Sequence, residues 1–193
     1  MNFFQAIILG IVQALTEYLP VSSSAHIRII GDLMLGADPG AAFTAIIQIG
    51  TELAVILYFR RDIINILSHW FGCLFGKNGP DWRARMGRGD KYATLGWNVI
   101  VGSIPIIILG FTLQNIIETS LRNLWITVTV LFLFGLLLWI VDARSRQIKT
   151  MDDMNYRDAF LFGLGQSMAL IPGVSRSGGT ITVGRALGYT RES

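Results

Sequence analysis

The sequence predicts an all-α polytopic membrane protein, built as an inverted-topology repeat with two re-entrant broken hairpins that meet near the midplane of the bilayer. Three observations support this prediction. The 193 residues are 52% hydrophobic and only 15% charged, with a mean hydropathy of +0.52, whereas an ordinary soluble domain is about one quarter charged. Several apolar stretches are long enough to cross a bilayer. A polar break rich in Pro, Ser and Gly occurs twice.

The two breaks are the clearest feature of the chain. One is Pro20-Val21-Ser22-Ser23-Ser24-Ala25-His26, and the other is Pro172-Gly173-Val174-Ser175-Arg176-Ser177-Gly178-Gly179-Thr180. Each lies between an apolar helical run and a second run, so we predict two broken hairpins whose tips form one site. An offset of 153 positions aligns the copies without a gap and pairs identical residues, namely Ala6 with Ala159, Gly10 with Gly163, Gln13 with Gln166, Ser22 with Ser175 and Ser24 with Ser177.

We expect one integral membrane domain over residues 1–193, with a first repeat over about 1–150 and a second from about 155. By the repeat offset, the second copy has run only about 40 residues at Ser193 and is incomplete there. We therefore expect its remaining spans to lie further along the natural chain or on another chain.

Three stretches have the length and apolarity of full spans, since about 20 helical residues cross the hydrocarbon core: residues 41–59, 94–111 and 124–141. The segments 60–91 and 144–149 are basic, which predicts that both are cytoplasmic. Residues 112–123 then form an outside loop. Residues 63–75 are short and mixed, so we expect them along the inner interface.

The rule that loops rich in Lys and Arg lie on the cytoplasmic side also predicts the direction of the hairpins. Residues 31–40 contain no Lys or Arg, and the span from residue 41 must begin outside to reach Arg60 and Arg61 inside. The first hairpin should therefore enter from the outside, and the second, which follows a basic loop, from the inside. Opposed hairpins of this kind are typical of inverted repeats.

The net charge of +3 does not indicate a nucleic-acid partner, because the basic residues lie in short loops between apolar spans. The membrane itself is the expected environment. The single Cys73 excludes an internal disulfide within these residues.

Arg176 is the most informative residue of the second break. Its guanidinium offers forked donors that match phosphate oxygens, and the helix that follows would add its positive N-terminal end. The alternative is an arginine that only pairs with Glu17 and holds the hairpins together. On the first interpretation the break is a phosphate cradle, with further hydroxyl and backbone donors at Gly173, Ser175, Ser177 and Thr180.

Gln13 and Glu17 are four residues apart, so they share one face of the helix that Pro20 ends. A carboxylate within a membrane is costly unless it is paired or functional. We predict that Glu17 is a general base or a ligand of a divalent cation, Mg or Ca, with Gln13 as a second candidate ligand. The alternative is an interhelical hydrogen bond or a carboxylate that reaches the outer surface.

The serines of the first break have two interpretations. Serines at a break commonly cap the next helix. A serine that faces an arginine, with a carboxylate or imidazole to accept its proton, can instead be a nucleophile toward phosphorus, and Ser23 is the candidate. His26 is a candidate base, nucleophile or acid, or else a hydrogen-bonded histidine at the mouth of a cavity.

A polar stripe follows the first span, with Thr44, Gln48, Thr51 and Glu52 on one helical face. We predict that it lines a cavity rather than facing lipid. Glu52 would either supply charge to the site or pair with a neighbouring helix.

These motifs resemble those of the undecaprenyl-diphosphate phosphatase family, also called the bacitracin-resistance proteins. That family is marked by a Glu/Gln-x-x-x-Glu helix motif, followed by Pro-Val-Ser-Ser and His, and by Pro-Gly-x-Ser-Arg-Ser-x-x-Thr. Here they stand at residues 13–17, 20–26 and 172–180, and the similarity extends over nearly the whole chain. Matched residue by residue, the family's functional positions fall on Glu17, Ser23, His26, Ser175, Arg176 and Thr180.

The resemblance implies hydrolysis of a polyprenyl diphosphate to the monophosphate lipid carrier, with a divalent cation. It implies a location in the bacterial cytoplasmic (inner) membrane, an active site open to the outside, and a role in cell-wall synthesis and bacitracin resistance. Two departures matter. Gln13 cannot be an ionised base, so Glu17 must take that role, and Ser23-Ser24-Ala25-His26 replaces the usual Ser-Thr-Gly-His.

A function of another class remains open at this point. Broken inverted repeats also occur in transporters, so the protein could be a carrier or flippase for an anionic lipid such as a polyprenyl phosphate, with Arg176 only binding it. The sequence does not choose between Ser23 and His26 as nucleophile, and it leaves homodimer formation open.

Overall fold

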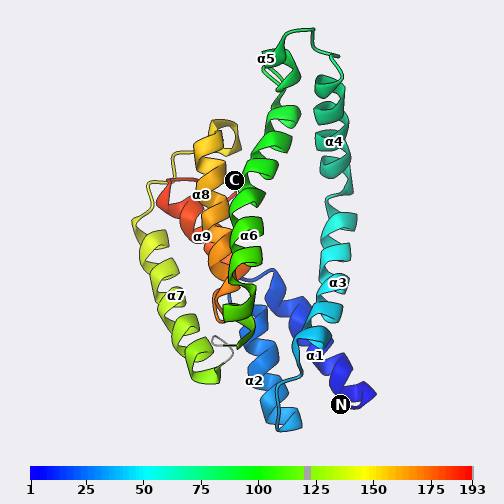
Figure 1. Ribbon diagram of the computed structural model, residues 1–193. Helices are drawn as coiled ribbons and strands as arrows, with labels where there is room; N and C mark the ends of the chain where they lie inside the picture. Colours follow the sequence, from blue (N-terminus) through cyan, green and yellow to red (C-terminus); the bar gives the residue numbers. More distant parts are fainter. Residues whose placement is uncertain (120–122, 193) are drawn as a thin grey trace.

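The computed structural model is a set of α-helices (Figure 1). It describes residues 1–119 and 123–192, and within these ranges the only β-structure is an isolated parallel bridge between Lys149 and Tyr189. The all-α prediction is therefore confirmed. The helices are α1 Phe3–Glu17, α2 Ser23–Leu35, α3 Ala41–Tyr58, α4 Arg60–Leu74, α5 Trp82–Arg85, α6 Lys91–Thr119, α7 Leu124–Arg144, α8 Tyr156–Ser167 and α9 Arg176–Ala186, with the 3₁₀ turns η1 Met151–Asp153 and η2 Met168–Leu170.

Two of the three predicted spans are continuous helices. Among the described residues, Lys91–Leu113 of α6 and the whole of α7 are long and apolar enough to cross a membrane. The remaining predicted span, residues 41–59, is formed by α3, and a bend of 72° follows it where α3 meets α4, directly before the paired arginines at positions 60 and 61. These helices confirm a multi-pass membrane protein. The bent pair adds a third span if it is taken as one crossing.

The connections differ in detail from those expected. Helix α6 continues to Thr119, so the outside loop predicted from residue 112 begins as helix, and its residues 120–122 lie outside the described residues. Helix α4 packs along α6. The expected position of residues 63–75 along the inner interface stays a prediction.

The two hairpins are α1–α2 and α8–α9. Figure 1 shows the first in the lower part of the molecule and the second above it, with their breaks turned toward each other. The tips touch, because the Ser177 hydroxyl donates a hydrogen bond of 3.3 Å to the Leu19 carbonyl. Opposed hairpins with meeting tips are thus present, while the inverted relation of two whole repeats stays a prediction.

Glycines allow the second hairpin to approach its neighbours backbone to backbone. A Cβ at Gly163 of α8 would overlap the carbonyl oxygen of Gly102 in α6, and a Cβ at Gly179 of α9 would overlap that of Gly165 in α8. Small residues permit this kind of close helix packing where no aqueous hydrophobic effect drives association. The packing anchors the second hairpin against α6.

Candidate active site

A pocket of about 350 Å³ lies where the two hairpin tips meet α3. Four predicted site residues line it, one from the first hairpin and three from the second. The remaining lining comes from the residue after Glu17, from α3 and from α8. The complete lining is Glu17, Tyr18, Thr51, Glu52, Val55, Gln166, Arg176, Ser177 and Thr180.

Glu17 is the hydrogen-bonding centre of the first hairpin. Its Oε2 accepts a 2.8 Å bond from the Gln13 amide and a 2.5 Å bond from the Ser23 hydroxyl. Gln13 is fully buried and Ser23 is 9% exposed, so both contacts are shielded from solvent. A serine that already donates its proton to a carboxylate has the geometry of a nucleophile next to its base.

The backbone of Ser22 brings Ser23 back toward Glu17. Ser22 has a positive φ of 63°, which is uncommon outside glycine and reverses the chain within the break. Its side chain makes no capping bond to α2 and instead lies 3.2 Å from the Ser24 hydroxyl. The common capping role of a serine therefore does not apply at this position.

His26 lies on α2, and like Ser23 it is absent from the lining of the pocket. Its Nδ1 is 2.9 Å from the Ser22 carbonyl oxygen. That contact is a hydrogen bond when Nδ1 carries the proton, which leaves Nε2 as the free acceptor of a neutral ring. The structure thus brings Ser23 to Glu17, and it places His26 one helical turn behind the break.

The second break ends as the N-terminus of α9, as predicted. Ser175 is the N-cap, and its Oγ accepts a 3.1 Å bond from the Gly178 N–H. The Thr180 hydroxyl donates to the carbonyls of Arg176 and Ser177 within the same turn. Since Arg176, Ser177 and Thr180 line the pocket, the positive end of this helix borders it.

Gly173 has a structural reason to be glycine. Its φ is +102°, and a Cβ there would overlap the Thr127 carbonyl oxygen of α7. The absence of a side chain at Gly173 therefore allows the backbone of the break to pack directly against α7. Its suggested role as a backbone donor to phosphate stays a prediction.

Arg176 pairs with Glu52 of α3, at 2.8 Å between Nη1 and Oε1. The alternative of a pair between Arg176 and Glu17 is wrong, because the observed carboxylate comes from the polar stripe on α3. The two side chains are 45% and 50% exposed, so they face the open side of the pocket. Helix pairing, one of two roles expected of Glu52, is confirmed.

Tyr18 and Gln166 are among the pocket residues that were not predicted as site residues. Tyr18 directly follows Glu17, and its hydroxyl donates a 2.8 Å bond to the Thr51 carbonyl. Gln166 is the repeat partner of Gln13 and lines the pocket from α8. The sequence could have indicated both residues, because Tyr18 is adjacent to Glu17 and Gln166 aligns with Gln13 in the repeat.

The pocket suits a cation by the chemistry of its oxygens. Its lining carries two carboxylates, Glu17 and Glu52, against the single guanidinium of Arg176, which leaves one net negative charge. In addition, the buried Oε1 of Gln13 has no hydrogen-bond partner among the described residues. Hard divalent cations prefer carboxylate and amide oxygens of this kind. Within the same ranges, no group of three or more His, Cys, Asp or Glu residues could hold a metal alone.

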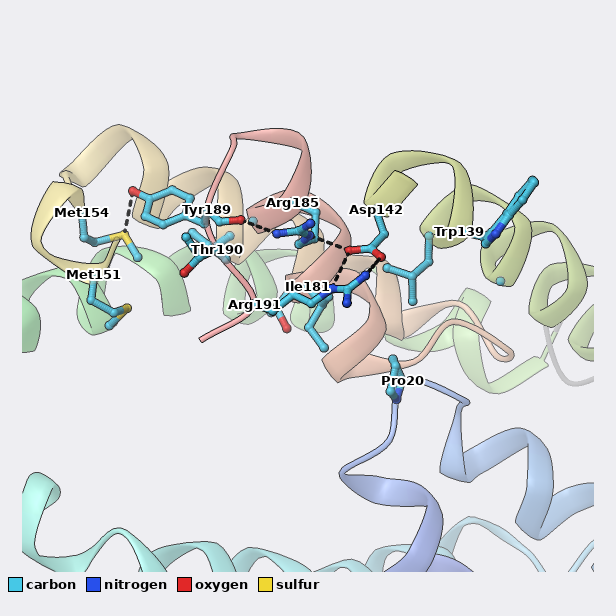
Figure 2. A pocket seen from close by; sticks show the side chains of 15 residues that line it. Pro20, Trp139, Asp142, Met151, Met154, Ile181, Arg185, Tyr189, Thr190 and Arg191 are labelled. Carbon is cyan, nitrogen blue, oxygen red and sulfur yellow. Dashed lines mark hydrogen bonds and ion pairs between the residues drawn. The ribbon is translucent and has the colours of Figure 1, made fainter. Parts of the chain in front are cut away.

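A larger, mainly apolar cavity of about 670 Å³ lies between α7, α9 and the segment after α9 (Figure 2). Asp142 joins its walls, since it accepts a 2.6 Å bond from Arg185 Nε and also pairs with Arg191. Thr180 lines both cavities and Pro20 lines the larger one. The apolar cavity therefore adjoins the polar pocket at the hairpin tips.

Comparison with known proteins agrees with the motifs. The family model for bacitracin resistance protein BacA matches residues 6–193. Curated relatives named undecaprenyl-diphosphatase are 89% identical in Bifidobacterium longum subsp. infantis and 72% identical in Bifidobacterium adolescentis, each over all 193 residues. Another with that name, from Paenarthrobacter aurescens, is 53% identical over 197 aligned residues. The chain spans 66% of the length of the first two relatives and 67% of the third. The chain belongs to the bacitracin resistance protein BacA family.

Proposed function

We propose that the protein is an integral membrane phosphatase that hydrolyses undecaprenyl diphosphate to the monophosphate and inorganic phosphate. The observation that carries the chemistry is the contact between Ser23 and Glu17 at the edge of a pocket that also holds Arg176. The shared name of the relatives supports the substrate. Because the chain spans 66% of their length, the activity is proposed for the whole protein.

The residues in and next to the pocket have separate roles in the proposed phosphoryl transfer. Arg176 and the N-terminus of α9 bind the terminal phosphate. Ser23 Oγ forms a bond to the terminal phosphorus while the bond from that phosphorus to the bridging oxygen breaks, so the lipid monophosphate leaves. The serine proton passes to Glu17. Water then hydrolyses the phosphoserine and releases inorganic phosphate.

Ser23 is favoured over His26 as the nucleophile. The 2.5 Å bond gives the serine proton an acceptor that itself lines the pocket, whereas the histidine ring is held at the Ser22 carbonyl and contacts no carboxylate among the described residues. Phosphoryl transfer passes through a loose transition state, so positioning and charge stabilisation account for most of the catalysis. A serine paired with a carboxylate that lines the same pocket as an arginine supplies both.

We infer that a divalent cation, Mg or Ca, takes part. The pocket lining has one net negative charge, and a diphosphate would add more. A cation would offset the charge of the phosphate oxygens. Oxygens of Glu17 and Gln13 are the candidate ligands, and removal of divalent cations by a chelator should lower phosphate release.

The proposed location is the bacterial cytoplasmic membrane, with the site open to the outside. The basic segments on either side of α5 lie at one end of the molecule, and the uncharged start of the chain lies at the other (Figure 1). A phosphatase in this place would return the lipid carrier to cell-wall synthesis and confer resistance to bacitracin.

Phosphate release from undecaprenyl diphosphate by the purified protein in detergent tests the proposal. We expect the wild type to release inorganic phosphate, and Ser23→Ala to lose most of this activity. Ser24→Ala is the matched control, because this neighbouring hydroxyl contacts Ser22 and not Glu17. A protein that binds the lipid but releases no phosphate would contradict the enzyme and indicate a carrier.

A further inference from the structure

We propose that two consecutive residues of α3, Thr51 and Glu52, act as a clamp that fixes the spacing between Glu17 and Arg176. Glu52 is then the positioning residue for the arginine. This inference rests on the proposed function of the same pocket, and it adds a role for a helix that belongs to neither hairpin.

The clamp consists of one hydrogen bond to each hairpin. From the first hairpin, the Tyr18 hydroxyl donates to the Thr51 carbonyl at 2.8 Å. From the second, Arg176 Nη1 donates to Glu52 Oε1, also at 2.8 Å. Since the acceptors are neighbours on one helix, a single turn of α3 holds both tips.

The turn that carries these acceptors is itself well ordered by local contacts. Thr51 is only 6% exposed, and its hydroxyl donates a 2.8 Å bond to the Gln48 carbonyl. Helix α3 also packs along α1. This turn of α3 is thus held in place, and it can fix the positions of Tyr18 and Arg176, which bind to it from the two hairpins.

Direct contact between the tips is too slight to set their spacing. The contact is a neutral 3.3 Å bond from the Ser177 hydroxyl to the Leu19 carbonyl. The Arg176–Glu52 pair is shorter and charge-assisted, although its side chains are 45% and 50% exposed and solvent screens part of its strength. Helix α7 packs against both α2 and α9, so it holds the two hairpins together. To α3 we assign the polar contacts that align Tyr18 and Arg176 within that packing.

The geometry indicates that Glu52 positions Arg176 and does not block the access of phosphate to its guanidinium. A guanidinium has five N–H donors, and Glu52 engages Nη1 only. No other hydrogen bond from the Arg176 side chain occurs within residues 1–119 and 123–192. The remaining donors can therefore grip phosphate oxygens while Glu52 holds the fork in place.

The test uses the protein expressed from its natural gene and purified in detergent. Glu52→Ala should lower kcat/KM for undecaprenyl diphosphate by roughly 10- to 100-fold, since a small misplacement of a binding group has effects of this size. Glu52→Gln should recover most of the loss, because its amide oxygen still accepts from Arg176. Asp62→Asn is the control, since it removes the same charge at an exposed position on α4.

Coupling between the two halves of the clamp is a second readout. Tyr18→Phe removes only the hydroxyl bound to Thr51. If both bonds serve one alignment, Tyr18→Phe combined with Glu52→Ala should lower kcat/KM by less than the product of the single effects. Strictly multiplicative effects would contradict a shared clamp.

A distance measurement separates the clamp from the enzymatic proposal. Spin labels at Leu33 and Phe160, both exposed, report on the first and second hairpin once Cys73 is replaced by Ser. We expect a narrow distance distribution in the wild type and in Glu52→Gln, and a broad one in Glu52→Ala. An unchanged distribution in Glu52→Ala overturns the clamp even if the enzyme is active. Absent phosphate release with the expected broadening refutes only the phosphatase.

Discussion

The Ser23 hydroxyl lies 2.5 Å from Oε2 of Glu17, across the break that separates α1 from α2. The same oxygen also accepts the Gln13 amide, so one carboxylate atom fixes both side chains. The contact requires the left-handed Ser22, which turns the chain back toward α1. Residues with an uncommon φ cluster at active sites, where surrounding contacts maintain the conformation, which fits the roles proposed for Ser23 and Glu17.

Glu17→Gln should abolish measurable turnover while Gln13→Glu should be tolerated. The amide removes the acceptor of the serine proton, a role worth roughly 10²–10⁴-fold in rate. A glutamate at position 13 adds a carboxylate where a cation is proposed, so its activity should depend more steeply on added Mg. Phosphate release over a series of Mg concentrations measures both effects, and the reverse ranking would show that the base was misassigned.

Arg176→Lys should lose roughly 10²-fold or more in kcat/KM. Lysine keeps the positive charge but lacks the planar fork that can bind Glu52 and phosphate oxygens together. The same kinetic assay on the folded variant provides the measurement. Near-normal turnover would mean that the arginine supplies charge alone, and the phosphate cradle would have to be abandoned.

Gly163→Ala should destabilise the protein by roughly 1–3 kcal/mol, the usual range for overpacking. The added methyl would overlap the Gly102 carbonyl, so α8 would have to move away from α6. The matched control is Gly110→Ala in α6, where a Cβ meets nothing within 4 Å. Thermal unfolding in detergent should show a lower Tm for Gly163→Ala only, and equal Tm values would contradict the close approach of these helices.

The α4–α6 contact should weaken in acid through Asp90. Burial raises the pKa of this carboxyl, but hydrogen bonds from His69 and from the Ala93 N–H outweigh it, so its pKa is below the usual value. A carboxyl of lowered pKa stabilises the fold above its unfolded pKa of about 3.9, and this contribution is lost as the pH falls through the folded value. The drop in Tm from pH 7 to about pH 3 should therefore be smaller in Asp90→Asn than in the wild type or in Asp62→Asn. An equal drop in all three would show that Asp90 does not link pH to stability.

The sequence predicted contacts within a helix better than contacts between helices. Gln13 and Glu17 lie four residues apart, so helical geometry alone places them on one face, and their 2.8 Å bond follows. Arg176 and Glu52 are 124 positions apart, and their pairing depends on how α3 packs beside the hairpins. The polar stripe showed that Glu52 needed a partner, but it did not show which charge would meet it.

The extent of α6 shows another limit of sequence reasoning. Polar residues from position 112 suggested a loop, yet the helix runs to Thr119. No glycine or proline occurs between residues 112 and 119, so nothing in the chain stops the helix there. Polarity marks where a span leaves the membrane, and it does not by itself end a helix.

Opposed hairpins lead to a prediction about membrane sidedness. The connection between α2 and α3 lies at one end of the molecule, and the segment that contains α5 lies at the other (Figure 1). Ala37 and Arg83 are exposed positions in these two regions. In intact cells, an impermeant thiol reagent should label Ala37→Cys directly and Arg83→Cys only after the membrane is opened. The wild type is the control, because its Cys73 is 2% exposed and should react little. Labelling of both variants from the same side would mean that the bent α3–α4 pair does not carry the chain across, and the two hairpins could not then enter from opposite faces.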